Sequence, residues 1–303
     1  MKGLFLDAVD ALADVYHANK RPGDPPLDIN EQADIPADAL PGLLAGYQFI
    51  LNDHTQLPTA TMAECKDLKH VIFLGTGARS YMHPEELAGL GITVHTIKGY
   101  GDIAVAEHAI ALMWAAARGV ARMDQGLRRG EWLRTEGRQL TGKTIGLLGF
   151  GGIAEQVARI AGGSGMRVIA WNRSPKTAAG VEFVELDRLL AESDVLSLHL
   201  LLTDETRGFL SAARIAQMRP GAILINTARA AVVEEAAMIA ALRSGQIGHA
   251  GLDVFNTEPL PPGHELATLE NVTLTAHSAF RTPEASDTLI RRALDIACRV
   301  ATG

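Results

Sequence analysis

The sequence has few features of a metal centre, a disulfide framework or a membrane anchor. Only two of its 303 residues are cysteine, Cys65 and Cys298, and neither lies in a metal-ligand spacing. Two isolated cysteines are typical of a reducing compartment. No apolar run reaches the ~18 residues of a transmembrane helix. Asp7 and Asp10 interrupt the apolar N-terminal stretch, so it lacks the core of a signal peptide. We therefore expect a soluble cytoplasmic protein with no metal and no membrane partner.

An excess of basic residues is also absent. The chain has 28 Lys and Arg against 35 Asp and Glu, a formal net charge of −7. A nucleic-acid binder normally presents a basic face, so the charge argues against that partner. Hydrophobic residues make up 47% and charged residues 21% of the chain, which indicates a substantial core. The length suggests about two domains.

What the sequence does contain is a glycine-rich turn between a strand pattern and a helix pattern. The apolar run Ile145–Leu148 has the length of a buried strand, and residues 153–161 are apolar at helical spacing up to Gly162-Gly163, which we read as the helix end. Arg167 to Trp171 then forms a second strand pattern. Gly149, Gly151 and Ala154 occupy the G-x-G-x-x-G/A positions of a dinucleotide-binding turn. The helix N-terminus after this turn would face the pyrophosphate.

The rest of the chain alternates between strand and helix patterns, which predicts an α/β fold with parallel sheets. Four further strands are expected after residue 174, giving six in the dinucleotide-binding sheet: Val195–Leu200, Ala222–Asn226, His249–Asp253 and Val272–Thr275. Before residue 100, strands are expected at Leu4–Leu6, Tyr47–Leu51, Val71–Leu74 and Thr93–Ile97. Residues 19–42 carry five prolines and are expected to be loop with short helical pieces.

Two long helices complete the prediction. Ile103 to Ala117 is too uniformly apolar for a surface helix, so we expect a buried helix between the domains with a polar first turn at Glu107 and His108. The final helical stretch, Glu284–Val300, is expected to return to the N-terminal domain. We therefore predict a substrate domain of residues 1–98 plus 280–303, and a dinucleotide-binding domain of residues 99–279.

Unusual polar residues gather at the carboxyl ends of the predicted strands, where open parallel sheets bind ligands. The residues at these ends are Asn172, Arg173, His199, Thr227, Ala228, Arg229, Asp253 and His277, with Glu258 in the loop after Asp253. A histidine beside a carboxylate is a proton donor suited to neutral pH, and an arginine offers a fork that matches a carboxylate. With a nicotinamide nearby, Arg229, Glu258 and His277 fit hydride transfer between a 2-oxo acid and a 2-hydroxy acid.

Each of these three residues has a structural alternative. Arg229 would pair with Glu234 or Glu235 at a helix start, and Glu258 would cap the turn before Pro259. His277 would be an ordinary loop histidine. Their shared position at one sheet edge is what favours catalysis.

At these residues the chain resembles the D-isomer-specific 2-hydroxyacid dehydrogenase family, which includes glyoxylate/hydroxypyruvate reductases. The resemblance covers residues 70 to 285 in the family's order. The matching segments are Gly75-Thr76-Gly77-Ala78, Val105-Ala106-Glu107-His108, Gly142 through Ala154, Leu198-His199-Leu200, Thr203-Asp204-Glu205-Thr206, Asn226-Thr227-Ala228-Arg229, Leu252-Asp253-Val254-Phe255 with Glu258-Pro259, and Thr275-Ala276-His277.

The resemblance implies two Rossmann-like or flavodoxin-like domains with the active site in the cleft between them. It implies that Arg229 binds the substrate carboxylate and polarises the carbonyl, that His277 donates the proton, and that Glu258 holds and charges His277. Backbone N–H groups of Thr76, Gly77 and Ala78 would bind the same carboxylate. The implied cofactor-binding residues are Val105, Gly149, Gly151, Gly152, Ile153, Asn172, Arg173, Ser174, His199, Thr206, Thr227, Ala228, Asp253 and Ala279.

The end of the second strand predicts the choice of cofactor. NAD-binding proteins of this fold place Asp or Glu there for the ribose 2′-OH, whereas this chain has Asn172 followed by Arg173 and Ser174. An arginine fork and a hydroxyl suit a 2′-phosphate, so we expect NADP(H) to be preferred, with NAD(H) possible. The alternative is that Arg173 is a solvated turn residue.

Three functions stay open at this point. The first is reduction of a small 2-oxo acid of the glyoxylate/hydroxypyruvate class, and the second is dehydrogenation of a larger D-2-hydroxy acid. The third is a dinucleotide-sensing protein that resembles the family's corepressors. The apolar helix and the resemblance also predict a homodimer. Two departures from the family pattern are Leu201, where Pro is usual, and Arg79, which either reads a second anionic group on the substrate or is solvated.

Overall fold

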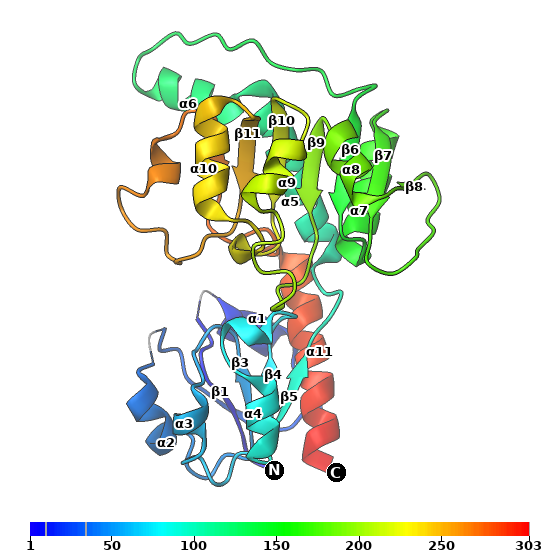
Figure 1. Cartoon of the computed structure of the whole chain (residues 1–303). Helices are drawn as coiled ribbons and strands as arrows, with labels where there is room; N and C mark the ends of the chain where they lie inside the picture. Colours follow the sequence, from blue (N-terminus) through cyan, green and yellow to red (C-terminus); the bar gives the residue numbers. More distant parts are fainter. Residues whose placement is uncertain (10, 34, 303) are drawn as a thin grey trace. The chain divides into compact units, whose positions relative to one another are not determined.

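The computed structural model describes residues 1–9, 11–33 and 35–302 (Figure 1). The chain divides into two units, Met1–Gly101 with Arg281–Gly303 and Asp102–Phe280. Each unit is built on a wholly parallel sheet with helices, as the alternating sequence pattern predicts.

The first unit has a five-stranded sheet in the order β2-β1-β3-β4-β5. Successive side chains of β1 point to opposite faces of this sheet. Leu4 and Leu6 belong to the buried cluster on one face, and Phe5 belongs to the cluster on the other. Both faces are covered, so the central strands read as continuous apolar runs. The strands are β1 Gly3–Phe5, β2 Leu27–Ile29, β3 Phe49–Asn52, β4 His70–Phe73 and β5 Thr93–Thr96.

The helices of this unit come from both of its chain segments. They are α1 Leu12–Asn19, α2 Leu40–Leu43, α3 Thr59–Met62, α4 Pro84–Gly89 and α11 Pro283–Thr302, with short 3-10 turns η1 Ala37–Ala39 and η2 Ala78–Ser80. The helix α11 buries Leu289, Ile290 and Leu294 in the same cluster as Phe5 and Phe49. The C-terminal stretch is therefore part of the core of the first unit.

The second unit has a seven-stranded sheet in the order β12-β11-β10-β9-β6-β7-β8. The chain runs outward from β6 through β7 to β8, then returns to pair β9 with the other side of β6, so the strand order reverses at β6. This reversal is the position at which open α/β sheets bind ligands. The strands are β6 Thr144–Leu148, β7 Arg167–Trp171, β8 Glu182–Phe183, β9 Val195–Leu198, β10 Ala222–Asn226, β11 Ile247–Leu252 and β12 Val272–Leu274.

Helices cover both faces of this sheet. Buried residues of α5 and α7 share one apolar cluster with Leu147, and those of α8, α9 and α10 share the opposite cluster with Leu148 (Figure 1). The helices are α5 Asp102–Arg118, α6 Val120–Arg128, α7 Gly152–Gly163, α8 Leu186–Glu192, α9 Ala212–Gln217 and α10 Glu235–Ser244, with 3-10 turns η3 Ala230–Val232 and η4 Glu265–Thr268. Among the described residues no single helix is long and apolar enough to cross a membrane. Taken together, α5 and α6 have the length and apolar composition of a membrane span, but the two helices are bent by 67° relative to each other.

Four details correct the sequence-based prediction. The sheet of the second unit has seven strands rather than six, because the two-residue strand β8 pairs with β7. The proline-rich stretch contains the edge strand β2, which lies between its prolines and pairs with β1. The helix α6, directly after α5, was not predicted. The helix α7 ends at Gly163, as predicted, but its C-cap is Ser164, and the left-handed residue that follows is Gly165, with φ 83°.

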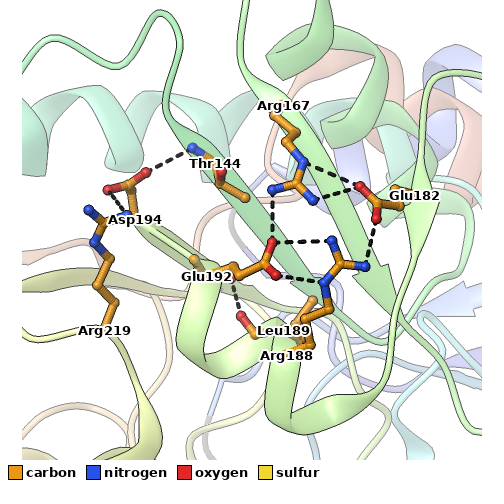
Figure 2. Close-up of polar contacts among 9 residues, drawn as sticks. Thr144, Arg167, Glu182, Arg188, Leu189, Glu192, Asp194 and Arg219 are labelled. Atoms are coloured by element: carbon orange, nitrogen blue, oxygen red, sulfur yellow. Dashed lines mark hydrogen bonds and ion pairs between the residues drawn. The ribbon is translucent and has the colours of Figure 1, made fainter.

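A ring of alternating charges links the first residues of β7 and β8 to two residues of α8 (Figure 2). Arg167 contacts Glu182 at 2.6 Å and Glu192 at 2.8 Å, and Arg188 contacts the same two glutamates at 2.7 and 2.6 Å. Each exposed pair alone contributes little to stability, but the shared partners make a network. The ring connects the short edge strand β8 to the rest of the sheet.

Candidate active site

The turn between β6 and α7 requires its first glycine for the fold itself. Gly149 has φ 90°, a left-handed conformation that residues with a Cβ rarely adopt. A Cβ there would lie 2.8 Å from the carbonyl oxygen of His199 and 2.9 Å from Leu200 Cδ2. The first position of the fingerprint therefore keeps β6 and β9 packed closely at the strand reversal.

The second glycine has no such role within the protein. Gly151 has φ −121° and ψ −165°, an extended conformation open to any residue. A Cβ added to Gly151 would meet no atom within 4 Å, so the surface above it is free. A glycine at the exposed N-cap of α7 leaves room for an anion to approach backbone N–H groups. The residues present thus fit a dinucleotide pyrophosphate.

Gly152, directly after Gly151, is the first residue of α7. A Cβ at Gly152 would lie 2.0 Å from Asp102 Oδ2, so the helix start packs against the start of α5. Ile153 is half-buried, and Val105 on α5 is buried. Of these three predicted cofactor-binding residues, Gly152 and Ile153 begin α7, and Val105 lies in the first turn of α5.

The loop after β7 holds the residues predicted to read the adenosine ribose. Asn172 Oδ1 accepts a hydrogen bond from the Phe150 N–H at 3.1 Å, and its Nδ2 donates to the Ser174 carbonyl at 2.8 Å. Asn172 therefore joins this loop to the glycine turn. Arg173 and Ser174 are exposed, and the Arg173 guanidinium forms an ion pair with Glu205 at 2.5 Å.

Lys176 is a residue that the sequence analysis missed. Its Nζ donates to the Phe150 carbonyl at 2.7 Å, and it lines a cavity of about 470 Å³ together with Gly151, Gly152 and Arg159. The sequence signal that could have indicated this residue is a lysine two positions after Ser174, close to the predicted ribose-binding residues. Its position depends on the path of the loop through Pro175, which no periodicity in the sequence predicts.

The strands on the other side of β6 end in residues that mainly shape their loops. His199 Nε2 lies 2.9 Å from Ser197 Oγ, and burial lowers the His199 pKa to about 4, so its ring is neutral at neutral pH. The Thr206 hydroxyl accepts from the Thr203 N–H at 2.7 Å and donates to the Leu201 carbonyl at 2.5 Å, which closes the loop after β9.

Arg229 lies just beyond β10, in a loop built by Asn226. The Asn226 side chain accepts from the Ala228 N–H at 3.0 Å and donates to the Arg229 carbonyl at 3.1 Å, while Thr227 is buried. The Arg229 guanidinium donates to the Ala228 carbonyl at 2.7 Å. Glu234 and Glu235, its alternative partners, bond instead to the Ala212 N–H and to Asn256. Arg229 is therefore not paired with the glutamates at the start of α10.

His277 and Glu258 form the closest histidine–carboxylate contact of the described residues. His277 Nδ1 lies 2.6 Å from Glu258 Oε2, and the two side chains are 29% and 32% exposed. The ring nitrogen Nε2 of His277 makes no hydrogen bond to any described residue. Glu258 Oε1 also accepts from the Phe255 N–H at 2.8 Å, so Glu258 caps its turn and holds His277 at the same time.

The charge of Glu258 is stabilised by these contacts. Burial acts to raise its pKa, but the hydrogen bonds from His277 and the Phe255 N–H and the positive charge of Arg229 outweigh burial. The pKa of Glu258 is therefore below its ordinary value, and the group remains a carboxylate at neutral pH. An ionised partner on Nδ1 fixes the orientation of the ring.

Asp253, at the end of β11, positions the loop that carries His277. Its buried carboxylate accepts from the Thr275 hydroxyl at 2.6 Å and from the N–H groups of Ser278 and Ala279 at 3.0 Å each, and its carbonyl accepts from the His277 N–H at 2.8 Å. His277 itself has φ 48°, a left-handed conformation that needs such support. The Asp253 carboxylate therefore orients the loop that carries His277.

His108 on α5 also supports this loop, although we expected it to be a polar exception in a buried helix. Its Nε2 lies 2.9 Å from Thr275 Oγ1 and 3.5 Å from Asp253 Oδ1. Burial acts to raise the Asp253 pKa, and the hydrogen bonds from His108, Thr275 and the two N–H groups outweigh it, so the pKa is lowered.

The predicted carboxylate-binding loop of the first unit follows β4. Thr76 is exposed, Gly77 is half-buried, and Ala78 begins the 3-10 turn η2. Arg79 in the same turn forms an ion pair with Glu85, so its guanidinium already has an anionic partner.

A parallel sheet whose glycine turn and helix N-terminus lie at the strand reversal defines a dinucleotide-binding unit of the Rossmann class. Residues 110–279 match the family model "D-isomer specific 2-hydroxyacid dehydrogenase, NAD binding domain". A glyoxylate reductase of Aeropyrum pernix is 44% identical over 208 residues, which span 64% of this chain and 62% of that protein. A hydroxypyruvate reductase of Thermotoga maritima is 40% identical over 235 residues, 75% of this chain and 76% of the relative.

The structure of D-lactate dehydrogenase from Escherichia coli has a TM-score of 0.88 to this chain, with 29% identity over 100% of this chain and 98% of that one. The protein belongs to the D-isomer-specific 2-hydroxyacid dehydrogenase family of oxidoreductases, whose nucleotide domain binds a nicotinamide dinucleotide. The match to the Aeropyrum enzyme spans less than two thirds of that relative's length.

Proposed function

We propose that the protein reduces a short 2-oxo acid of the glyoxylate/hydroxypyruvate class to the D-2-hydroxy acid, and catalyses the reverse reaction. The observation that carries the proposal is the 2.6 Å contact between His277 and Glu258 at the carboxyl edge of the sheet, with Arg229 at the end of the neighbouring strand. The names of the similar glyoxylate reductase of Aeropyrum pernix and hydroxypyruvate reductase of Thermotoga maritima support this substrate class.

In this proposal His277 acts as the general acid. Glu258 holds Nδ1, which leaves Nε2 as the nitrogen that gives its proton to the carbonyl oxygen as the oxygen becomes a hydroxyl. The bound nicotinamide supplies the hydride that the carbonyl carbon receives. The carboxylate of Glu258 stabilises the protonated ring before transfer, and it accepts no proton itself. In the reverse direction the neutral ring takes the hydroxyl proton.

Arg229 is proposed to bind the substrate carboxylate through its two terminal nitrogens. A bidentate guanidinium fixes the orientation of the acid as well as its charge, which a lysine cannot do. The N–H groups of Thr76, Gly77 and Ala78 are proposed to contact the same carboxylate. Because the 2-oxo group lies next to the carboxylate, the orientation set by Arg229 also places the carbonyl oxygen for protonation.

For the cofactor we propose a preference for NADPH over NADH. Gly151 and the start of α7 would bind the pyrophosphate, and Arg173 and Ser174 would bind the 2′-phosphate. The support is the absence of an acidic residue at position 172 and the exposed guanidinium of Arg173 next to it. Lys176 adds a second positive charge beside the glycine turn.

A turnover assay with glyoxylate, hydroxypyruvate, pyruvate and a branched 2-oxo acid, each with NADPH and with NADH, tests the proposal. We expect the highest kcat/KM with one of the first two acids and NADPH. Arg173→Ala should reduce the NADPH preference about 10-fold or more, because a charged contact contributes ~1.5–3 kcal/mol. Turnover only with the branched acid would support a dehydrogenase of larger acids. Dinucleotide binding without turnover of any acid would support a dinucleotide sensor.

We also propose that the protein is a cytoplasmic homodimer. The support for a second copy is a run of exposed apolar side chains in and after α6, namely Val120, Leu127 and Trp132, the last of which is 80% exposed. Cys65 and Cys298 are both free thiols, as expected in a reducing compartment. Sedimentation velocity should give a dimer for the natural protein and a monomer for Trp132→Ser, and an unchanged mass in the variant would contradict this interface.

A further inference from the structure

An ion pair connects two loops on opposite sides of the strand reversal. Arg173 follows β7 and Glu205 follows β9, and these strands lie on the two sides of β6. The Arg173 Nη1 to Glu205 Oε2 distance is 2.5 Å, although the two side chains are 79% and 73% exposed. The pair thus spans the position where this fold binds its dinucleotide.

Both loops are held by their own hydrogen bonds, so the pair is not needed to shape them. Asn172 fixes the backbone before Arg173 through the Phe150 N–H and the Ser174 carbonyl. The Thr206 hydroxyl closes the turn that carries Glu205. Two exposed side chains on separately fixed loops contribute little to stability, and the pairing therefore calls for another explanation.

We propose that Glu205 is a determinant of cofactor preference, because its carboxylate competes with the 2′-phosphate of NADPH for the Arg173 guanidinium. This inference rests on the proposed function, in which Arg173 reads that phosphate. Because Glu205 occupies Arg173 Nη1, a phosphate that binds both terminal nitrogens as a fork must displace this carboxylate. NADH carries no 2′-phosphate and does not require the exchange. Glu205 therefore narrows the difference in binding affinity between NADPH and NADH.

Equilibrium binding of NADPH and NADH, measured by calorimetry without any 2-oxo acid, tests this inference. Glu205→Gln removes the negative charge and keeps the side-chain size. We expect it to lower the Kd of NADPH about two- to fivefold, the range allowed by an exposed ion pair, and to leave the Kd of NADH unchanged. In the Arg173→Ala background the same substitution should have no effect on NADPH.

Asp204→Asn provides the matched control. Asp204 is exposed in the same turn, carries the same charge, and makes no hydrogen bond or ion pair with any described residue. The control should leave both dissociation constants unchanged at ~0.15 M salt, where exposed charges are screened beyond about 8 Å. The inference would be overturned if Asp204→Asn lowered the Kd of NADPH as much as Glu205→Gln does, or if Glu205→Gln still lowered that Kd in the Arg173→Ala background. Either result would show a general charge effect.

The outcomes separate this inference from the proposed function. If Arg173→Ala weakens NADPH binding but Glu205→Gln does not strengthen it, Arg173 reads the phosphate and the competition by Glu205 is refuted. If Arg173→Ala leaves NADPH binding unchanged, the cofactor proposal itself fails. Because no 2-oxo acid is present, neither result depends on the substrate proposed above.

Discussion

Replacing Gly151 by alanine should separate cofactor binding from folding. The backbone at Gly151 has an extended conformation, and a new Cβ would meet no atom within 4 Å. Alanine restricts the unfolded chain, which stabilises by ~0.4–1 kcal/mol, whereas the N-cap preference for glycine over alanine opposes this by a similar amount. The free energy of unfolding should therefore change by less than about 1 kcal/mol.

Dinucleotide binding should respond much more strongly. The new methyl group would occupy the free surface where we expect the pyrophosphate, and overpacking of this kind costs ~1–3 kcal/mol, or roughly 5- to 150-fold in affinity. Gly149→Ala is the contrasting variant. Its φ of 90° and the 2.8 Å approach to the His199 carbonyl should destabilise the fold by ~2 kcal/mol or more.

Urea unfolding and calorimetric titration with NADPH provide the two readouts. The expected pattern is near-normal unfolding with weakened binding in Gly151→Ala, and reduced stability in Gly149→Ala. If Gly151→Ala bound NADPH with the natural affinity, the pyrophosphate would not approach this glycine, and the assignment of the glycine turn would be refuted.

Two further predictions follow from the charged groups. Arg229→Lys should raise KM and lower kcat, with a loss in kcat/KM of about 10- to 150-fold because a point charge replaces the fork, and full activity in steady-state assays would refute the role of Arg229. The hydrogen bond to Asp53 raises the His54 pKa to about 9, so the stability from charged His54 is complete below pH 6.5 and is lost as pH rises through about 9. Because the side chain is 35% exposed, we expect urea unfolding of the first unit to show a loss of only about 1 kcal/mol, absent in His54→Gln, and an equal loss in that variant would contradict the assignment.

The sequence predicted those parts of the fold whose signal is local. The strand β6 and the start of α7 follow from an apolar run, a glycine turn and a helical period, and the structure has them there. The strand β2 was missed because Leu27-Asp28-Ile29 is not an apolar run and follows two prolines, and β8 was missed because it has only two residues. Such short strands owe their conformation to the neighbouring strand with which they pair, rather than to a pattern of their own.

The candidate site was predictable to the extent that it depends on where strands end. Arg229 and His277 were grouped on that basis, and the structure places Glu258 against His277. The pairing of Arg173 with Glu205 was not predicted, because 32 residues separate them in sequence. The use of the Asp253 carboxylate was also missed, because hydrogen bonds to N–H groups of a loop depend on the path of that loop.

The central claim is that His277, held by Glu258, is the proton donor in the reduction of a 2-oxo acid. The most direct measurement is kcat for glyoxylate and hydroxypyruvate reduction with NADPH in the natural protein and in His277→Ala, with the Kd of NADPH measured alongside. The account predicts a fall in kcat of about 10²–10⁴-fold, the usual contribution of a general acid, and an unchanged Kd. Near-normal turnover in His277→Ala would contradict it.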